Sequence, residues 1–446
     1  MTHRRIRRGA AARAAPAALA LALAALGLAL APAACSRPSG GTRIVLVTLD
    51  TLRYDCLERA APSMPKLAAV ARRGADFEHA WAATSSTQPT HASLFTGLHP
   101  WQHGVHRNGE VLQDAEQTLT ETLHAAGWWT GAVVASLPLA RKFGFAQGFD
   151  VYDDAFTTDL DVGEWADELD EGGHFYTPCD EVTQRALALL DEARGDKQFL
   201  WVHYFDAHAP YGDTGTRPMK VGELLGAAKS RAPGLPGLIA QARQLYDQDT
   251  TAIDDSLDRL LSRLAQDEPA WQTHVIVTAD HGESFGDDGG FGHGSTLTPP
   301  QVHVPLVVLS PRVAAGRRAD VSGSVDVAAT VLALAGLPRS GHGRDLTEAP
   351  PASASAFGMR RTFAEPAPHV LVDGSVEMLQ GDQFYAVVDG SQVVGDTEQV
   401  AGAPPERADE LRRLFGVFDA ELQAKPTEEL LDPTTQGQLE ALGYVR

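Results

Sequence analysis

Residues 43–50 read RIVLVTLD, an apolar run that Thr48 alone interrupts and that ends in an aspartate. Apolar runs without regular polar alternation are typical of strands that are covered on both faces, as in a parallel sheet between two layers of helices. Four similar runs follow along the chain: WTGAVVAS (129–136), FLWVHYFD (199–206), THVIVTAD (273–280) and VPLVVLSP (304–311). These runs predict the strands of one central sheet.

Stretches with helical spacing separate these runs, and several of them stop at glycine. They are residues 64–74, 116–127, 180–195, 238–266 and 324–337. The alternation predicts an α/β fold, an α/β/α sandwich with a central, mostly parallel sheet over residues 43–340. Residues 341–370 are rich in Pro, Ala, Ser and Gly and predict a linker. Residues 371–446 predict a small C-terminal α+β subdomain, with a hairpin at 383–396 that turns at Asp-Gly and a helix at 405–423.

The N-terminus has a basic start followed by an Ala/Leu run that ends in small residues. This pattern predicts a secretory signal peptide over residues 1–34, followed by a tether at 35–42. Cys35 stands where a bacterial lipoprotein signal has its acylated cysteine, although Pro32 occupies a place usually held by Leu. We therefore expect an exported periplasmic or cell-envelope lipoprotein that contacts the membrane through Cys35. The alternative is an N-terminal membrane anchor.

The chain is acidic, and its charge limits the classes of partner. Residues 1–34 contain five arginines and no acidic residue, so their removal changes the net charge from −21 to −26. This charge argues against nucleic acid as a partner and against general attraction of anions. An anion site must then be local, built from metal, backbone N–H groups or histidines. Beyond Cys35, only Cys56 and Cys179 remain, and the sequence leaves open whether they pair.

Three predicted strands end in acidic or histidine residues: Asp50, then Asp206 with His208, then Asp280 with His281. Ligands bind beyond the carboxyl ends of strands in open parallel sheets, so these side chains could converge on one site. A single aspartate after a strand is more often a helix or turn cap. Asp50, Asp280 and His281 together suit a divalent metal ion such as Zn²⁺ or Mn²⁺, and less selectively Ca²⁺ or Mg²⁺.

Residues 85–97, SSTQPTHASLFTG, predict a helix that begins near Thr87 and ends at Gly97. The start of such a helix offers N–H groups to an anion. Thr87 could simply cap the helix. Alternatively, its hydroxyl could act as a nucleophile if a metal ion activated it.

Several ordered motifs resemble those of the sulfatase family within the alkaline phosphatase superfamily. They are IVLVTLDTLRYDCL (44–57), TQPTHASLFTGLHPWQHGV (87–105), VHYFDAHAPY (202–211) and VTADHGESFGDDGGFGHGSTL (277–297). The resemblance runs from about residue 43 to 337 and then sporadically to the end. It implies that Thr87 is the nucleophile and that it shares the metal with Asp50, Asp280 and His281.

The resemblance also assigns residues that face the substrate. His208 and His293 would do so, one of them as general acid, and His91 and Asp206 would bind substrate. Without the resemblance, His293 would be a turn histidine between glycines. One metal ion per chain is favoured, and a second ion could be held by Asp206, His208 and His293.

The departures from the family pattern change the expected chemistry. Sulfatases have a cysteine, converted to formylglycine, in place of Thr87 and an arginine in place of His91. Many also have a second aspartate in place of Thr51. Many have a Gly-Lys-x-His motif that binds the anion, and residues 131–140 lack it. No formylglycine is expected here, because threonine cannot form it. Residues 87–105 also resemble the Thr-x-Pro-x-His-x-Ser segment of nucleotide pyrophosphatase/phosphodiesterases, which use the threonine itself as the nucleophile.

The resemblance therefore implies a metal-dependent hydrolase of phosphate mono- or diesters that works through a covalent Thr87 intermediate. Its substrate would be a small-molecule, glycan or lipid ester. A sulfuric ester hydrolase is the first alternative. The second is a catalytically inactive envelope-binding protein with the same fold. Residues 213–237 predict a loop-like insert where substrate choice could lie.

Overall fold

The computed structural model describes residues 40–349, with gaps at 59, 159–173, 213–217, 269 and 295–296, together with five strands between 355 and 396. The predicted signal peptide, Cys35, most of the predicted tether and the predicted helix at 405–423 lie outside the described residues. Within the described part, no helix is both long enough and apolar enough to cross a membrane.

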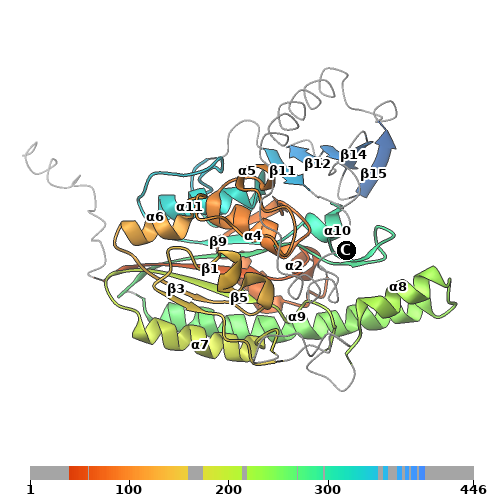
Figure 1. Cartoon of the computed structure of the whole chain (residues 1–446), viewed down its shortest axis with the longest axis horizontal. Coiled ribbons are helices and arrows are strands. Elements are labelled where there is room, and N and C mark those ends of the chain that lie inside the picture. Colours follow the sequence, from red (N-terminus) through yellow and green to blue (C-terminus); the bar gives the residue numbers. More distant parts are fainter. Residues whose placement is uncertain are drawn as a thin grey trace, which may run out of the picture.

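An eight-stranded sheet forms the centre of the molecule, in the order β10-β2-β9-β6-β1-β5-β3-β4 (Figure 1). Only β9 runs against its neighbours. The sheet is therefore mostly parallel, as the unbroken apolar runs predict. The strands are β1 (Thr42–Leu49), β2 (Ala75–Trp81), β3 (Trp129–Val133), β4 (Val151–Asp153), β5 (Lys197–Tyr204), β6 (Gln272–Ala279), β9 (Leu306–Leu309) and β10 (Gly316–Gly323).

Helices cover both faces of this sheet, which confirms the α/β/α sandwich. On one face α4 (Thr87–Thr96) packs with α11 (Val325–Leu334), and α6 (Leu119–Ala125) lies beside them. On the other face α7 (Cys179–Glu192) packs along the 32-residue α9 (Leu235–Gln266), which also contacts α3 (Pro65–Ala71). Short helices complete the fold: α2 (Asp55–Glu58), α5 (Pro100–His103) and α10 (Pro299–Val302).

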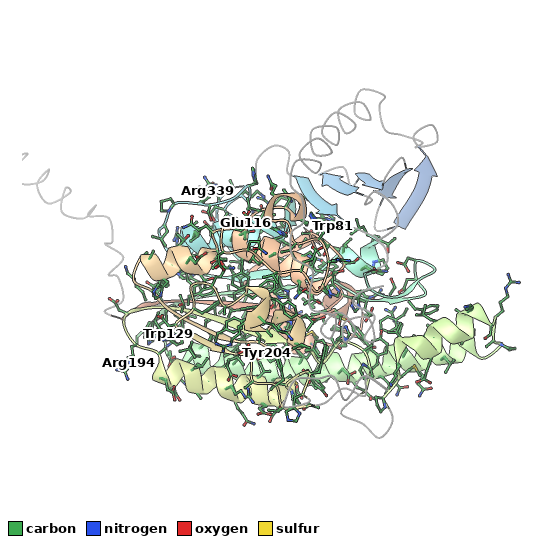
Figure 2. The ribbon with its side chains drawn as sticks, viewed as in Figure 1. Trp81, Glu116, Trp129, Arg194, Tyr204 and Arg339 are labelled. Atoms are coloured by element: carbon green, nitrogen blue, oxygen red, sulfur yellow. The ribbon has the colours of Figure 1, made fainter. Side chains whose placement is uncertain are left out.

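The core lies between the sheet and its helices, where side chains fill the space (Figure 2). Ile44, Val45, Leu46 and Val47 of β1 are all fully buried, which explains why the run has no polar alternation. Each such burial contributes about 1.5–3 kcal/mol relative to an exposed side chain. Beneath α4, the rings of Phe95 and Trp201 pack 4.5 Å apart. This packing ties the helix that begins at Thr87 to β5.

Three strands of the sheet were not predicted: β2, β4 and β10. The run ADFEHAW of β2 and GRRADVSG of β10 contain charged residues, and β4 has three residues at the sheet edge. Such strands lack the continuous apolar signal of central ones. The expected loop at 213–237 was also wrong, because α8 (Val221–Lys229) occupies part of it and α9 begins at Leu235.

Beyond residue 350, the described strands form two antiparallel groups. β11 (Ser355–Met359) pairs with β12 (His369–Asp373), so part of the predicted linker is strand. β13 (Glu377–Gln380), β14 (Gln383–Val388) and β15 (Ser391–Asp396) pair in sequence. The pairing of Val388 with Ser391 confirms the predicted hairpin.

Candidate active site

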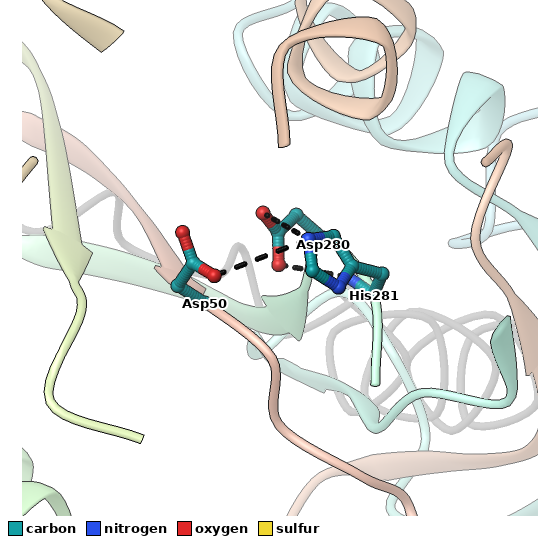
Figure 3. A group of neighbouring side chains, drawn as sticks. All are labelled: Asp50, Asp280 and His281. Atoms are coloured by element: carbon teal, nitrogen blue, oxygen red, sulfur yellow. Dashed lines mark hydrogen bonds and ion pairs between the residues drawn. The ribbon is translucent and has the colours of Figure 1, made fainter. Parts of the chain in front are cut away.

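The strand register places two carboxylates at the same edge of the sheet. β1 and β6 are parallel neighbours in which Leu49 pairs with Ala279, so Asp50 and Asp280 both follow paired residues. The ligating atoms of Asp50, Asp280 and His281 all lie within 4.8 Å of one another, and all three residues are buried (Figure 3). The structure therefore brings together the predicted metal ligands.

The backbone after Asp50 is strained in a way that helps this convergence. Thr51 has a φ of 55°, a left-handed conformation that costs a β-branched residue about 1–3 kcal/mol. Its N–H donates to Asp280 Oδ1 at 3.2 Å, and its carbonyl accepts from the Tyr246 hydroxyl at 2.9 Å. The turn at Thr51 thus links the ends of β1 and β6 directly.

The ring of His281 has a defined orientation. Its Nδ1 donates to the Gly282 carbonyl at 3.0 Å, which leaves the lone pair on Nε2. Nε2 lies 3.6 Å from Asp280 Oδ2 and 3.9 Å from Asp50 Oδ1. His281 therefore directs a lone pair at the two carboxylates, as a metal ligand should.

The charge of this cluster is not balanced by protein groups. Burial raises the pKa of Asp50 to about 7, and His281 opposes the rise only in part. Burial and the Asp50 charge also raise the pKa of Asp280. Burial lowers the pKa of His281, but the two carboxylates outweigh it and the net shift is upward. Among the described residues, both oxygens of Asp50 and Oδ2 of Asp280 meet no hydrogen-bond donor.

Buried carboxylate oxygens without donors are costly, and a divalent cation would satisfy them. Two carboxylates and one imidazole are also the ligand types that such a cation takes in proteins. The residues present therefore fit one divalent metal ion.

Thr87 is the first residue of α4 and does not cap it. Ser86 is the N-cap residue, with extended backbone, and Gly97 closes the helix in a left-handed conformation, as predicted. The Thr87 hydroxyl instead lies 3.4 Å from His281 Nε2, fully buried. The predicted nucleophile and the predicted metal ligands thus form one cluster.

The start of α4 offers few N–H groups for an anion. The Gln88 N–H donates to Asn108 Oδ1 at 2.8 Å, Pro89 has no N–H, and the Thr90 N–H donates to the Ser86 carbonyl. Asn108, which the sequence reasoning missed, is buried, and in the described part of the chain its Nδ2 has no acceptor. A buried amide donor beside the nucleophile segment is suited to bind an oxyanion.

His91 does not lie where substrate contact requires it. Its ring is fully buried behind Thr87, with Nδ1 donating to the Thr87 carbonyl at 2.9 Å and Nε2 3.0 Å from Thr48 Oγ1. Trp201 Nε1 donates to the same Thr48 oxygen at 2.9 Å, so the Thr48 hydroxyl hydrogen points to His91. Burial lowers the pKa of His91 to about 3. The geometry corrects the predicted substrate contact to support of the nucleophile's backbone.

Asp206 also departs from its predicted place. Its Oδ1 accepts a hydrogen bond of 3.0 Å from the backbone N–H of Cys179, the first residue of α7. A carboxylate at a helix N-terminus is a common stabilising contact. Within the described ranges, the candidate group for a metal is Asp50 with Asp280 and His281, so the predicted second set of Asp206, His208 and His293 does not assemble.

His208 and His293 do lie together near the metal cluster. Their rings are 4.9 Å apart, and the His293 ring is 4.5 Å from that of His281. His208 stacks on Phe205 at 4.6 Å. Burial lowers the pKa of His208 to about 3 and, with the charge of His281, lowers that of His293 well below 6.5.

Glu283 is a further member of the site that the sequence reasoning missed. Its Oε1 lies 3.2 Å from His293 Nδ1, and the carboxyl is fully buried, which raises its pKa to about 7. The signal was present in the run DHGE, because Glu283 lies two residues beyond His281. A carboxyl beside one ring nitrogen orients the ring and stabilises its protonated form.

The two remaining cysteines do not pair. Cys56 and Cys179 are both free and buried. The Cys56 thiol lies 3.6 Å from the Tyr246 hydroxyl, and the Cys179 sulfur accepts from Ser256 at 3.4 Å. They are core residues rather than a disulfide.

Known proteins share this fold and sequence pattern. A family model described as Sulfatase matches residues 42–337. The chain is 24% identical over 318 residues to "Uncharacterized sulfatase YidJ" of Escherichia coli (strain K12), a match that covers 60% of this chain and 62%, less than two thirds, of that protein.

Solved structures with low sequence identity show the same fold. The phosphonate monoester hydrolase SpPMH from Silicibacter pomeroyi superposes with a TM-score of 0.60 at 19% identity, covering 87% of this chain and 96% of that one. BT4656, solved in complex with its substrate D-glucosamine-2-N,6-O-disulfate, superposes with a TM-score of 0.61 at 16% identity, covering 87% and 99%. With the family match extending over most of the chain, this protein belongs to the sulfatase family.

Proposed function

We propose that this protein hydrolyses phosphate mono- or diesters through a covalent intermediate on Thr87. The observation that carries the proposal is the position of the Thr87 hydroxyl, 3.4 Å from His281 Nε2. Beside it, among the described residues, both oxygens of Asp50 and Oδ2 of Asp280 lack donors. A hydroxyl in that place is available as a nucleophile and is not used as a helix cap.

The residue types favour phosphate over sulfate. Threonine cannot become formylglycine, so turnover requires hydrolysis of an ordinary ester of its hydroxyl. A sulfate ester of threonine would be a stable trap, whereas phosphate transfer through a hydroxyl ester is a familiar two-step route. His91, buried and neutral, also supplies no positive charge where sulfatases have arginine.

The metal ligands would be Asp50, Asp280 and His281, with Thr87 beside them. When bound, a divalent cation would supply positive charge that stabilises the transferring group and favours the ionised Thr87 hydroxyl. In the first step Thr87 Oγ1, whose proton passes to solvent, forms a bond to phosphorus, the bond to the ester oxygen breaks, and that oxygen receives a proton. In the second step water attacks phosphorus and loses a proton, the bond from phosphorus to Thr87 Oγ1 breaks, and Thr87 regains its proton. The product released is phosphate from a monoester or a phosphate monoester from a diester.

His293 is the proposed proton donor to the leaving oxygen, and Glu283 is its partner. The negative charges of the bound ester and of Glu283 would favour the doubly protonated ring, against the lowering of its pKa by burial. The 3.2 Å contact of Nδ1 with Glu283 Oε1 orients the ring. His208 lies close enough to share this role. In the second step the same pair would take a proton from the attacking water, as the reverse of the first step requires. Asn108 Nδ2 is the proposed donor to an oxygen of the transferring group.

A substrate panel with intact-mass analysis tests the proposal. Aryl phosphate monoesters, phosphodiesters and sulfates are incubated with the wild type, with Thr87→Ala and with Thr87→Cys. We expect phosphoryl turnover by the wild type and, with a slow phosphodiester, a phosphate adduct located on Thr87. Sulfate turnover by the unmodified threonine enzyme, in preference to phosphate, would favour the sulfuric ester alternative. Absence of both turnover and bound metal would favour an inactive binding protein.

The site's location in the cell is proposed from the N-terminus alone. We infer export and lipid attachment at Cys35, because a basic start and an Ala/Leu run precede it. Labelling with radioactive palmitate should mark the wild type and not Cys35→Ser. A small-molecule, glycan or lipid phosphate ester outside the cytoplasm would then be the substrate.

A further inference from the structure

His203, in β5, is a fully buried histidine beside the metal cluster with no role in the steps above. β5 is the parallel neighbour of β1, and His203 pairs with Thr48, two residues before Asp50. The His203 Nε2 lies 3.5 Å from Asp50 Oδ2. His203 Nε2 therefore faces Oδ2 of Asp50, whereas His281 Nε2 faces Oδ1 of the same carboxylate.

The tautomer of His203 follows from its other nitrogen. The backbone N–H of Ala135 donates to His203 Nδ1 at 3.2 Å. A backbone N–H can only donate, so Nδ1 must hold the lone pair and the ring hydrogen must be on Nε2. Because Nε2 then carries a hydrogen, it cannot be a metal ligand. Among the described residues, neither His203 Nε2 nor Asp50 Oδ2 has a partner at full hydrogen-bonding geometry, and the two atoms lie 3.5 Å apart. The one is a donor and the other an acceptor, so each can satisfy the other after a small movement.

The comparison with His281 sharpens this assignment. His281 gives its Nδ1 hydrogen to a carbonyl and keeps a lone pair on Nε2, whereas His203 accepts at Nδ1 and keeps a hydrogen on Nε2. Both rings therefore face Asp50, but His281 presents a lone pair and His203 presents a hydrogen. The backbone partner of each Nδ1 sets this difference, since the residue type is the same.

The packing around His203 also prevents the ring from turning. The His91 ring meets it edge-on at 5.3 Å, and the Trp201 ring lies 6.4 Å away. A flipped ring would lose the Ala135 hydrogen bond and leave that buried N–H without its acceptor. The donor thus has a fixed direction towards Asp50.

We propose that His203 is a positioning residue that holds the Asp50 carboxylate through its Nε2 hydrogen, so that Oδ1 is directed towards the shared metal position with His281. Partners of this kind orient metal ligands and raise metal affinity. The inference rests on the metal-dependent function proposed above.

Metal binding alone tests it, without a substrate. The affinity of the purified protein for Mn²⁺ is measured from the EPR signal of the free ion, for the wild type and three variants. His203→Phe keeps a ring but removes both nitrogens. His203→Gln keeps an acceptor and a donor. His274→Phe is the matched control, since His274 is a buried histidine of β6, on the other side of β1, whose Nδ1 is bonded to Ser310.

We expect His203→Phe to bind Mn²⁺ about 10- to 100-fold more weakly, with His203→Gln and His274→Phe close to the wild type. The unfolding temperature of each metal-free variant shows that it folds. If His203→Phe fails to fold, His203→Asn replaces it, because that side chain is too short to bridge Ala135 and Asp50.

A folded His203→Phe with wild-type Mn²⁺ affinity overturns the proposal, and so does an equal loss in His203→Gln. These results do not depend on which ester is hydrolysed. Failure of the phosphate hypothesis would instead appear as an absence of phosphoryl turnover in a protein that binds Mn²⁺ normally.

Discussion

The hydroxyl oxygen of Thr87 lies 3.4 Å from Nε2 of His281, so the first residue of a helix on one face of the sheet meets a residue that follows β6. Neither residue uses that atom in secondary structure. The same Nε2 of His281 lies 3.9 Å from Asp50 Oδ1 and 3.6 Å from Asp280 Oδ2. This contact brings the nucleophile and the metal ligands into a single site.

Replacing the Thr87 hydroxyl should remove activity without affecting the fold. We expect Thr87→Ala to lower kcat about 10³-fold or more, because no other group can form the covalent intermediate. Thr87→Ser should keep measurable activity. Thr96→Ala is the control, since Thr96 is buried in the same helix and its hydroxyl bonds backbone groups, at Ala92 within the helix and at Leu98 just beyond it. Steady-state kinetics with an aryl phosphate measure kcat for each variant. Equal losses of kcat in Thr87→Ala and Thr96→Ala would contradict a specific role for Thr87.

Asp280→Asn should separate metal binding from folding. An amide oxygen can still accept from the N–H groups of Thr51 and His281, but one of two buried negative charges disappears. We expect the metal-free variant to be as stable as the wild type or more so, while the gain in unfolding temperature on adding Zn²⁺ is lost.

The matched control for this change is Asp326→Asn. Asp326 is also buried and accepts backbone hydrogen bonds, from Gly323 and Arg344, but it lies outside the metal group. That variant should keep the full Zn²⁺-dependent gain. A gain that survives in Asp280→Asn would argue against Asp280 as a ligand.

Glu283→Gln should make the rate more dependent on the leaving group. Without the carboxyl on His293 Nδ1, proton delivery weakens, so esters with poorly leaving alcohols should lose about 10²- to 10⁴-fold in rate. Nitrophenyl esters need little protonation and should lose much less. A series of aryl and alkyl phosphodiesters measures the slope, with the exposed Glu223→Gln as control. An unchanged slope would remove the dyad from the mechanism.

Asn108 should stabilise the transferring group. Asn108→Asp keeps the acceptor for the Gln88 N–H but replaces the free amide donor with an oxygen. We expect kcat/KM to fall about 10²-fold or more, with little change in unfolding temperature, because an oxyanion-binding donor is lost and a negative charge faces the phosphate. Asn108→Ala should lose both activity and stability, since the buried Gln88 N–H then has no acceptor. Full activity in Asn108→Asp would show that the amide does not contact the substrate.

Folding stability should depend on pH through His274. Burial, with a smaller contribution from Arg312, lowers the pKa of His274 from 6.5 to about 4. Between these values the unfolded chain takes up a proton that the folded chain refuses, so stability falls as the pH drops from about 6.5 to about 4. His274→Gln should lose less between pH 7 and pH 5 in urea unfolding, by up to about 2 kcal/mol. A His274→Gln profile identical to that of the wild type would refute the effect.

The sequence was most informative where a signal is local. Unbroken apolar runs predicted β1, β3, β5, β6 and β9, and Gly97 marked the end of α4. It was least informative where strands carry polar residues, as in β2 and β10, and it could not predict that β9 runs antiparallel. Strand direction depends on how the chain returns to the sheet, which a single run of residues does not encode.

The sequence by itself determined the chemistry that is available: a threonine at the nucleophile position, two aspartates and a histidine after apolar strands, and no arginine at position 91. Only the tertiary structure decided what each polar group does. His91 and Asp206 were expected at the substrate, but partners distant in sequence, Thr48 and Cys179, engage them instead. His203 and Glu283 emerged for the same reason. A buried side chain's role depends on which donors and acceptors surround it, and these come from strands that meet only in the folded chain.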